Sequence, residues 1–141
     1  MSSPTIDLSP LRKALALLTE ALAFWAALPD GTALKPHLRS AVIQSFEFSY
    51  ELSVRLLRRV LIERSESADR VADLSFNDLL RAAADAGLLA DAPRWREWRE
   101  MRNATSYAYD EARAQAVAQR AAAFAQDALT LLDALEASLA Q

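Results

Sequence analysis

Residues 39–61 read RSAVIQSFEFSYELSVRLLRRVL, and this stretch decides the fold. At about 100° per residue, its apolar side chains form one broad face and a narrower stripe nearly opposite. The broad face contains Val42, Ile43, Phe46, Tyr50, Val54, Leu57, Val60 and Leu61, and the narrow stripe contains Phe48, Leu52 and Leu56. A helix that is apolar on two sides either lies at the centre of a bundle or shares one side with another chain. The pattern therefore predicts a long, largely buried helix.

The flanking sequence predicts further helices and contains no alternating strand pattern. Ser75 and Asp110 are typical N-cap residues, Gly87 is a typical C-terminal stop, and few turn residues occur elsewhere. The fold class is therefore all-α, an antiparallel bundle of four to five helices. The predicted helices span about residues 10–28, 37–63, 75–87, 93–103 and from 110 onward, with a polar joint at 65–73.

The composition fits one domain over residues 1–141, of which residues 1–9 are expected to be a flexible N-terminus. The chain has no cysteine, which excludes disulfides and thiolate metal sites, and the net charge of −3 argues against general nucleic-acid coating. The first residues lack the order of a secretory signal, and Thr19 and Glu20 interrupt the most apolar early stretch. We therefore expect a cytoplasmic protein with no membrane segment.

The joint before the last helix, MRNATSYAYD at residues 101–110, is the candidate functional segment. On a helical wheel, Trp95, Trp98 and Arg102 fall within about 60° of one another. Arg102 then either stacks on a tryptophan or caps the helix end, or it is a guanidinium in a partly closed site that grips phosphate. Tyr107 and Tyr109 share a face if the joint is extended. Either phenol is a packing group or an acceptor nucleophile for a partner enzyme.

Three blocks carry a family resemblance: residues 39–61, DLLRAAADAGLL at 78–89, and MRNATSYAYDEARA at 101–114. Together they resemble the nucleotidyltransferase substrate-binding proteins, small helical members of the HEPN group that pair with minimal nucleotidyltransferases. In toxin members of that group, an arginine and a histidine from two protomers form a metal-independent ribonuclease site. A neighbouring tyrosine accepts AMP from the partner. The resemblance implies that Arg102 is the arginine, Asn103 the polar residue after it and Tyr109 the acceptor, with Asp110 in support.

The chain departs from the family pattern at Tyr107, which stands where the family usually has histidine. A phenol with a pKa near 10 is a poor base at neutral pH, so we expect ribonuclease activity to be weak or lost. Tyr107 is then a degenerate catalytic position and a second candidate acceptor. The only histidine, His37, replaces the missing base only if the bundle brings it to the joint. We expect no metal site and no tightly bound cofactor, with any nucleotide supplied by the partner.

The leading hypothesis is an accessory subunit that forms a homodimer and binds a minimal nucleotidyltransferase, as half of a pair resembling a toxin–antitoxin system. Phe48, Leu52 and Leu56 are then a dimer or partner surface. One alternative is an active ribonuclease toxin that binds RNA and uses Arg102 with Tyr107 or His37. A second alternative is a purely structural helical interaction module in which the joint is a capped turn.

Overall fold

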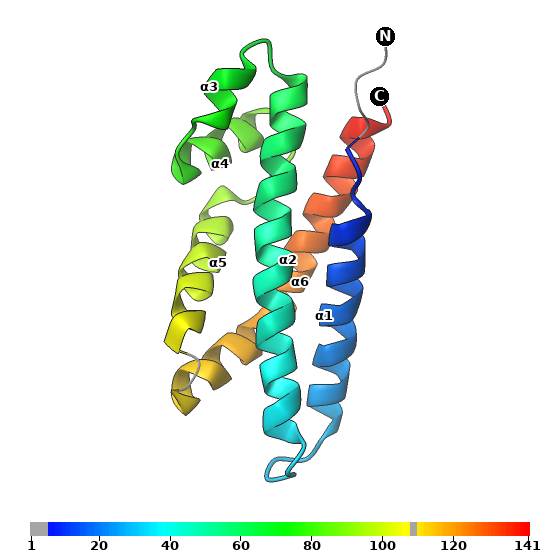
Figure 1. Ribbon diagram of the computed structural model, residues 1–141, viewed down its shortest axis with the longest axis vertical. Coiled ribbons are helices and arrows are strands. Elements are labelled where there is room, and N and C mark those ends of the chain that lie inside the picture. The colour runs from blue at the N-terminus through cyan, green and yellow to red at the C-terminus, as the bar shows by residue number, and fades with distance from the viewer. Residues whose placement is uncertain (1–5, 108–109) are drawn as a thin grey trace.

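The computed structural model describes residues 6–107 and 110–141, with the side chain of Tyr107 left out of that description. All regular structure in these residues is helical, so the predicted all-α antiparallel bundle is confirmed (Figure 1). It contains one α-helix more than predicted. The elements are α1 (Ser9–Ala27), α2 (Lys35–Arg64), α3 (Ala68–Ala72), α4 (Phe76–Asp85), α5 (Ala92–Ala104), the 3-10 helix η1 (Thr105–Tyr107) and α6 (Glu111–Leu139).

Helix α2 is the centre of the molecule. It contacts each of the other five α-helices: α1 lies on one side, the shorter α3, α4 and α5 lie on the other, and α6 crosses behind α2 from the α5 side to the α1 side (Figure 1). The two apolar sides predicted for residues 39–61 are therefore explained by a central position. Leu56 is only 4% exposed and Leu52 packs against the core, whereas Phe48 is 57% exposed. The prediction of Leu56 as part of a dimer or partner surface is therefore wrong, because its side chain is used inside the bundle.

An aromatic cluster joins α2 to α5 and α6, the two helices on either side of the joint. The Phe124 ring of α6 packs edge-on against Phe46 of α2, with 4.9 Å between centroids, and against Trp95 and Trp98 of α5 at 5.8 and 5.7 Å. Phe46, Trp98 and Phe124 are fully buried. Burying an aromatic side chain stabilises a fold by roughly 1.5–3 kcal/mol, and the edge-on geometry adds to that. This cluster fixes α5 against α2 and α6.

Short side chains let α6 approach its neighbours closely. Its buried alanines recur every three or four residues, so they form one seam along the helix; they are Ala114, Ala118, Ala121, Ala125 and Ala128. At the far end of α6, Glu136 accepts a hydrogen bond of 2.9 Å from Arg12 of α1. Helix α6 therefore runs beside α1 at one end and meets α5 at the other.

Capping residues define the helix ends as predicted. The Ser75 hydroxyl accepts a hydrogen bond from the Asp78 amide, and the Asp110 carboxylate accepts from the amides of Ala112 and Arg113. Gly31 and Gly87 adopt positive φ angles of 86° and 77° after α1 and α4, a conformation that glycine adopts without steric cost.

Two segments differ from the prediction. The polar joint at residues 65–73 contains α3, and the Arg58 guanidinium holds it by donating to the carbonyls of Val71, Ala72 and Leu74 at 2.9–3.4 Å. At the start of the chain, Ile6 and Leu8 are each only 6% exposed and belong to the core. The expected flexible N-terminus therefore does not include residues 6–9, and residues 1–5 lie outside the described part.

Candidate functional site

The candidate site lies where α5 ends and α6 begins. Helix α5 is attached there by Trp98, whose Nε1–H donates to Oδ2 of Asp127 on α6 at 2.8 Å. The Nε of Arg94 donates to the same oxygen at 3.0 Å, and the guanidiniums of Arg94 and Arg120 lie over the Trp98 ring at 5.2 and 5.1 Å from its centroid. Because these contacts fix the rotation of α5 about its axis, they determine which neighbouring residues Arg102, in the last turn of α5, can contact.

Arg102 points to α2. Its Nε and Nη2 donate to one oxygen of Glu51 at 3.1 and 2.7 Å, and Nη2 lies 3.8 Å from Glu47. Nη1 donates to the Thr105 hydroxyl at 3.2 Å, and that hydroxyl donates to the Arg102 carbonyl. The side chain is 29% exposed. The arginine therefore occupies a partly closed site, as one of the alternatives predicted, and its fork is directed at carboxylates.

The two carboxylates occupy positions that an anionic ligand would take. Glu47 and Glu51 are one helical turn apart on α2, and their side chains are 33% and 49% exposed. Ion pairs with this much solvent contact contribute about 0–1 kcal/mol. A guanidinium held this weakly remains available to a phosphate, for which its planar fork is well suited.

Tyr50 is a tyrosine near Arg102 that the sequence interpretation placed only in the core. Burial raises its pKa to about 12, although the charges of Arg99 and Arg102 lower it in part. The phenol is 7% exposed, and at neutral pH it stays protonated. Tyr50 therefore does not supply the base that the joint lacks.

The remaining predicted residues of the joint have different positions. Asn103 is exposed on the surface of α5, and Asp110 is the N-cap of α6, so its carboxylate is used by backbone amides. Tyr107 ends η1, but its side chain is not among the described groups, and Tyr109 lies outside the described residues. The proposed meeting of Arg102 with a phenol of the joint therefore stays a prediction.

His37 is far from Arg102 in the same chain. It is exposed in the first turn of α2. Glu47 and Glu51, which contact Arg102, follow 10 and 14 residues later, or roughly 15 and 21 Å along the axis at 1.5 Å per residue. His37 therefore cannot act as the base for Arg102 within one protomer.

Phe48 is the exposed part of the predicted apolar surface. It lines a groove of about 340 Å³ between α2 and α6, and the other lining residues are Arg39, Ser40, Ile43, Gln44, Glu47 and Ala114. Glu47 belongs both to this groove and to the Arg102 site. The groove and the arginine site are therefore continuous on one face of the molecule.

Residues 6–107 and 110–141 contain neither a metal-binding cluster nor a membrane-spanning helix. No group of three His, Asp or Glu side chains in them is arranged to hold a metal ion. In the same residues, no helix combines the length and apolar character needed to cross a membrane.

The sequence interpretation missed the acidic partners of Arg102. Neither Glu47 nor Glu51 is among the candidate residues that the sequence predicts. The available signal was the spacing of two glutamates by one turn within FEFSYEL, beside the exposed Phe48. That spacing shows that the carboxylates share a face but does not show which helix stands opposite.

The fold and the site together define a small all-α domain with a partly buried arginine at the junction of its last two long helices. Comparisons with known proteins identify the family. The family model for "Nucleotidyltransferase substrate binding protein like" matches residues 6–137. The chain belongs to this family, as its sequence blocks predicted.

Two relatives from Haemophilus influenzae are similar to the chain. A solved structure, described as revealing the fold of a substrate binding domain of a nucleotidyltransferase, is 31% identical, with a TM-score of 0.83 over 92% of this chain and 99% of that chain. A curated protein named "Probable ribonuclease HepT" is 41% identical over 80 residues, which are 57% of this chain and 55% of that protein. The match thus spans about half the length of that curated relative.

Proposed function

We propose that this chain is the accessory subunit of a minimal nucleotidyltransferase, which it binds as a homodimer in a pair resembling a toxin–antitoxin system. The family match over residues 6–137 supports the partnership. The observation that carries the proposal is Arg102, which lies in the joint, is 29% exposed and pairs with partly exposed carboxylates. In this role the guanidinium binds a phosphate group that the partner brings.

Tyr109 is the proposed acceptor of AMP. Its phenolic oxygen forms a bond to the α-phosphorus of a nucleoside triphosphate held by the partner, and the bond from that phosphorus to pyrophosphate breaks. The phenolic proton passes to a base on the partner. Because a phenol is mostly protonated at neutral pH, the partner must supply both the base and the activation. In this proposal Arg102, seven residues earlier in the chain, offsets the charge on the transferred phosphate.

The groove beside Phe48 is the proposed surface for a second copy of the chain. The 57% exposed ring of Phe48 lines this groove together with Ile43, and the groove adjoins the Arg102 site through Glu47. A second copy seated there would cover Phe48 and enclose Arg102 from the open side.

Co-expression with a small nucleotidyltransferase, ideally the one encoded next to this chain, tests the proposal. We expect the two proteins to purify together, and we expect the intact mass of this chain to increase by whole AMP units. Tyr109→Phe should remove the increment, and Tyr107→Phe is the matched control in the same joint. If the double variant loses an increment that Tyr109→Phe retains, Tyr107 is the acceptor. No complex at micromolar concentration would contradict the partnership.

A second candidate function is a metal-independent ribonuclease, which the similarity to a protein named "Probable ribonuclease HepT" favours. In a single chain, His37 lies too far along α2 to assist Arg102, so activity would need a second protomer or the Tyr107 phenol. This function predicts growth arrest on expression and RNA cleavage in vitro, both abolished by Arg102→Ala. Harmless expression together with intact RNA would exclude it.

A further inference from the structure

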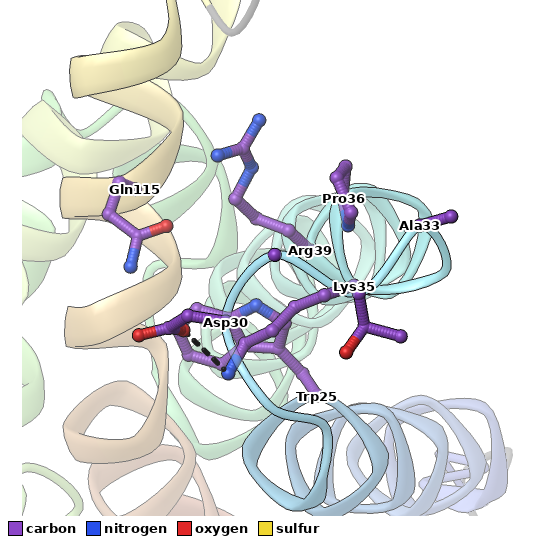
Figure 2. Close-up of a pocket in the computed structure, with 9 residues that line it drawn as sticks. Trp25, Asp30, Ala33, Lys35, Pro36, Arg39 and Gln115 are labelled. Atoms are coloured by element: carbon purple, nitrogen blue, oxygen red, sulfur yellow. Dashed lines mark ion pairs between the residues drawn. The ribbon is translucent and has the colours of Figure 1, made fainter.

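A basic cavity, separate from the Arg102 site, lies at the opposite end of α2 from α3, beside the turn that joins α1 to α2. It has a volume of about 300 Å³. Trp25 comes from the end of α1, Lys35 and Arg39 from the first turns of α2, and Gln115 from α6 (Figure 2). Asp30 of the turn also faces the cavity and is paired with Lys35. None of these residues belongs to the Arg102 site.

The side-chain charge at this N-terminal end of α2 is positive, whereas helices usually have negative side chains there. The first turn of this 30-residue helix contains no acidic residue, and Lys35 and Arg39 stand one turn apart at its positive end. A cation at the N-terminus of a helix is unfavourable for the helix dipole, and the effect is strongest for Lys35 in the first turn. The amides of Lys35 and His37 are already bonded to the carbonyls of Thr32 and Leu34. The positive potential in the cavity is therefore presented mainly by side chains.

Arg39 is a largely buried cation with incomplete compensation. Its side chain is 16% exposed, but its carboxylate partner Glu111 is 86% exposed and lies 3.3 Å away. Its Nε is buried and makes no hydrogen bond to any described residue. A buried donor without a partner is destabilising, so an acceptor supplied by a ligand would be favourable here.

Lys35, like Arg39, has an exposed carboxylate as its ion-pair partner. Its ammonium donates to the Leu28 carbonyl at 2.6 Å and lies 5.4 Å from the centre of the Trp25 ring. Its carboxylate partner Asp30, at 3.2 Å, is 98% exposed. Both cations of the cavity are thus paired with carboxylates that extend into water. A stronger anion can displace such carboxylates at little cost.

We propose that this cavity binds the phosphate group of a small phosphate monoester. The Arg39 guanidinium grips two phosphate oxygens, the Lys35 ammonium faces a third, and Glu111 and Asp30 move aside. The cavity is larger than phosphate alone requires, so the organic part of the ligand lies toward Gln115 and Trp25. Binding of phosphate here does not require the nucleotidyltransferase partner, so the two proposals can fail separately. Arg39 also lines the groove beside Phe48, so a second copy of the chain seated in that groove would border this cavity.

Titration of the full chain with AMP, inorganic phosphate and adenosine, followed by calorimetry, tests the site. Tryptophan emission gives a second readout, because Trp95 and Trp98 are 3% and 0% exposed and only Trp25 lines the cavity. We expect AMP to bind and to change the emission, and Trp25→Phe to remove this change, which assigns the signal to the cavity. Adenosine should not bind. Equal affinity for AMP and phosphate would show that the site recognises only the phosphate group. Tighter binding of AMP would show that the site also recognises the organic part of the ligand.

Variants then locate the binding to Arg39. Arg39→Gln should weaken binding at least tenfold, and Glu111→Gln, which removes the competing carboxylate, should strengthen it two- to fivefold. A purely structural Arg39–Glu111 pair does not predict this gain. Arg81→Gln, which alters an exposed pair with Asp78 on α4, is the matched control and should have no effect.

Three results would overturn the proposal: no binding of AMP or phosphate at millimolar concentration, equal binding of adenosine and AMP, or unchanged binding in Arg39→Gln. Circular dichroism checks that each variant is folded. If Arg39→Gln does not fold, Glu111→Gln and Lys35→Gln decide the outcome, because the first should tighten binding and the second should weaken it.

Discussion

Arg102 of α5 donates two hydrogen bonds to a single oxygen of Glu51 on α2, across 51 residues of sequence. Both groups remain in contact with solvent, since the side chains are 29% and 49% exposed. The contact therefore aims the guanidinium without burying it. This matters for the proposed function, because an arginine that binds a partner's phosphate must be positioned but not permanently neutralised.

The first prediction concerns the strength of this contact. A double-mutant cycle of Arg102→Gln and Glu51→Gln, measured by urea unfolding, should give a coupling energy of about 0.2–1 kcal/mol, the range of exposed ion pairs. The pair of Arg12 and Glu136, with side chains 56% and 43% exposed, is the control and should lie in the lower part of that range. A coupling of about 2 kcal/mol or more would be typical of a desolvated contact, and Arg102 would then be locked.

The second prediction concerns the anchor of α5. Asp127→Ala removes the acceptor of the buried Trp98 indole and of Arg94, so it should lower the free energy of unfolding by about 2–3 kcal/mol. Asp127→Asn keeps an acceptor oxygen and should cost less. Asp133→Ala changes an exposed aspartate on the same helix and should be nearly neutral. If Asp127→Ala and Asp133→Ala had equal effects on thermal or urea unfolding, the anchor would be unimportant.

Much of the fold could be predicted because its determinants are local. The period of residues 39–61, the caps Ser75 and Asp110 and the stop at Gly87 all act within a few residues, and the structure contains each of them. Helix α3 could not be predicted in this way. It has only five residues, and the Arg58 guanidinium, 13 to 16 residues earlier in the chain, holds its carbonyls.

The site could be predicted only in part, because its contacts are between distant segments. A helical wheel placed Arg102 on the inner side of α5, but it could not show that α2 stands opposite with Glu47 and Glu51. A wheel likewise gives the direction of Leu56 without its depth, and contacts with α3 to α5 on that side of α2 decide that it is buried. The basic cavity at Arg39 combines residues of α1, α2 and α6, and a periodic pattern within one helix does not predict such a combination.

The third prediction concerns the alanine seam of α6. Ala121 is fully buried, so Ala121→Leu forces extra volume into a packed interior and should cost about 1–3 kcal/mol. Ala122→Leu places the same side chain on the exposed side of the same helix and should change stability by less than about 0.5 kcal/mol. Urea unfolding of the two variants measures the difference. Equal stability would show that α6 does not pack closely through this seam.

The fourth prediction uses the alkaline titration of Tyr50. Burial raises its pKa to about 12 in the folded chain, whereas an unfolded tyrosine titrates near 10. The folded state therefore binds the phenolic proton more tightly. Its contribution to stability is complete below pH 10 and is lost as pH rises from 10 to 12. Because each pKa unit corresponds to about 1.4 kcal/mol, the loss attributable to Tyr50 should be on the order of 2–3 kcal/mol at pH 12.

Absorbance at 295 nm measures this directly, because the chain has only three tyrosines. We expect one of the three to titrate late, near pH 12, and Tyr50→Phe to remove that phase. Stability measured between pH 10 and 12 should fall less steeply in Tyr50→Phe than in the unaltered chain. Tyr107→Phe is the control and should leave the late phase in place. A late phase that survives Tyr50→Phe would mean that another phenol, and not the one near Arg102, is held protonated by the fold.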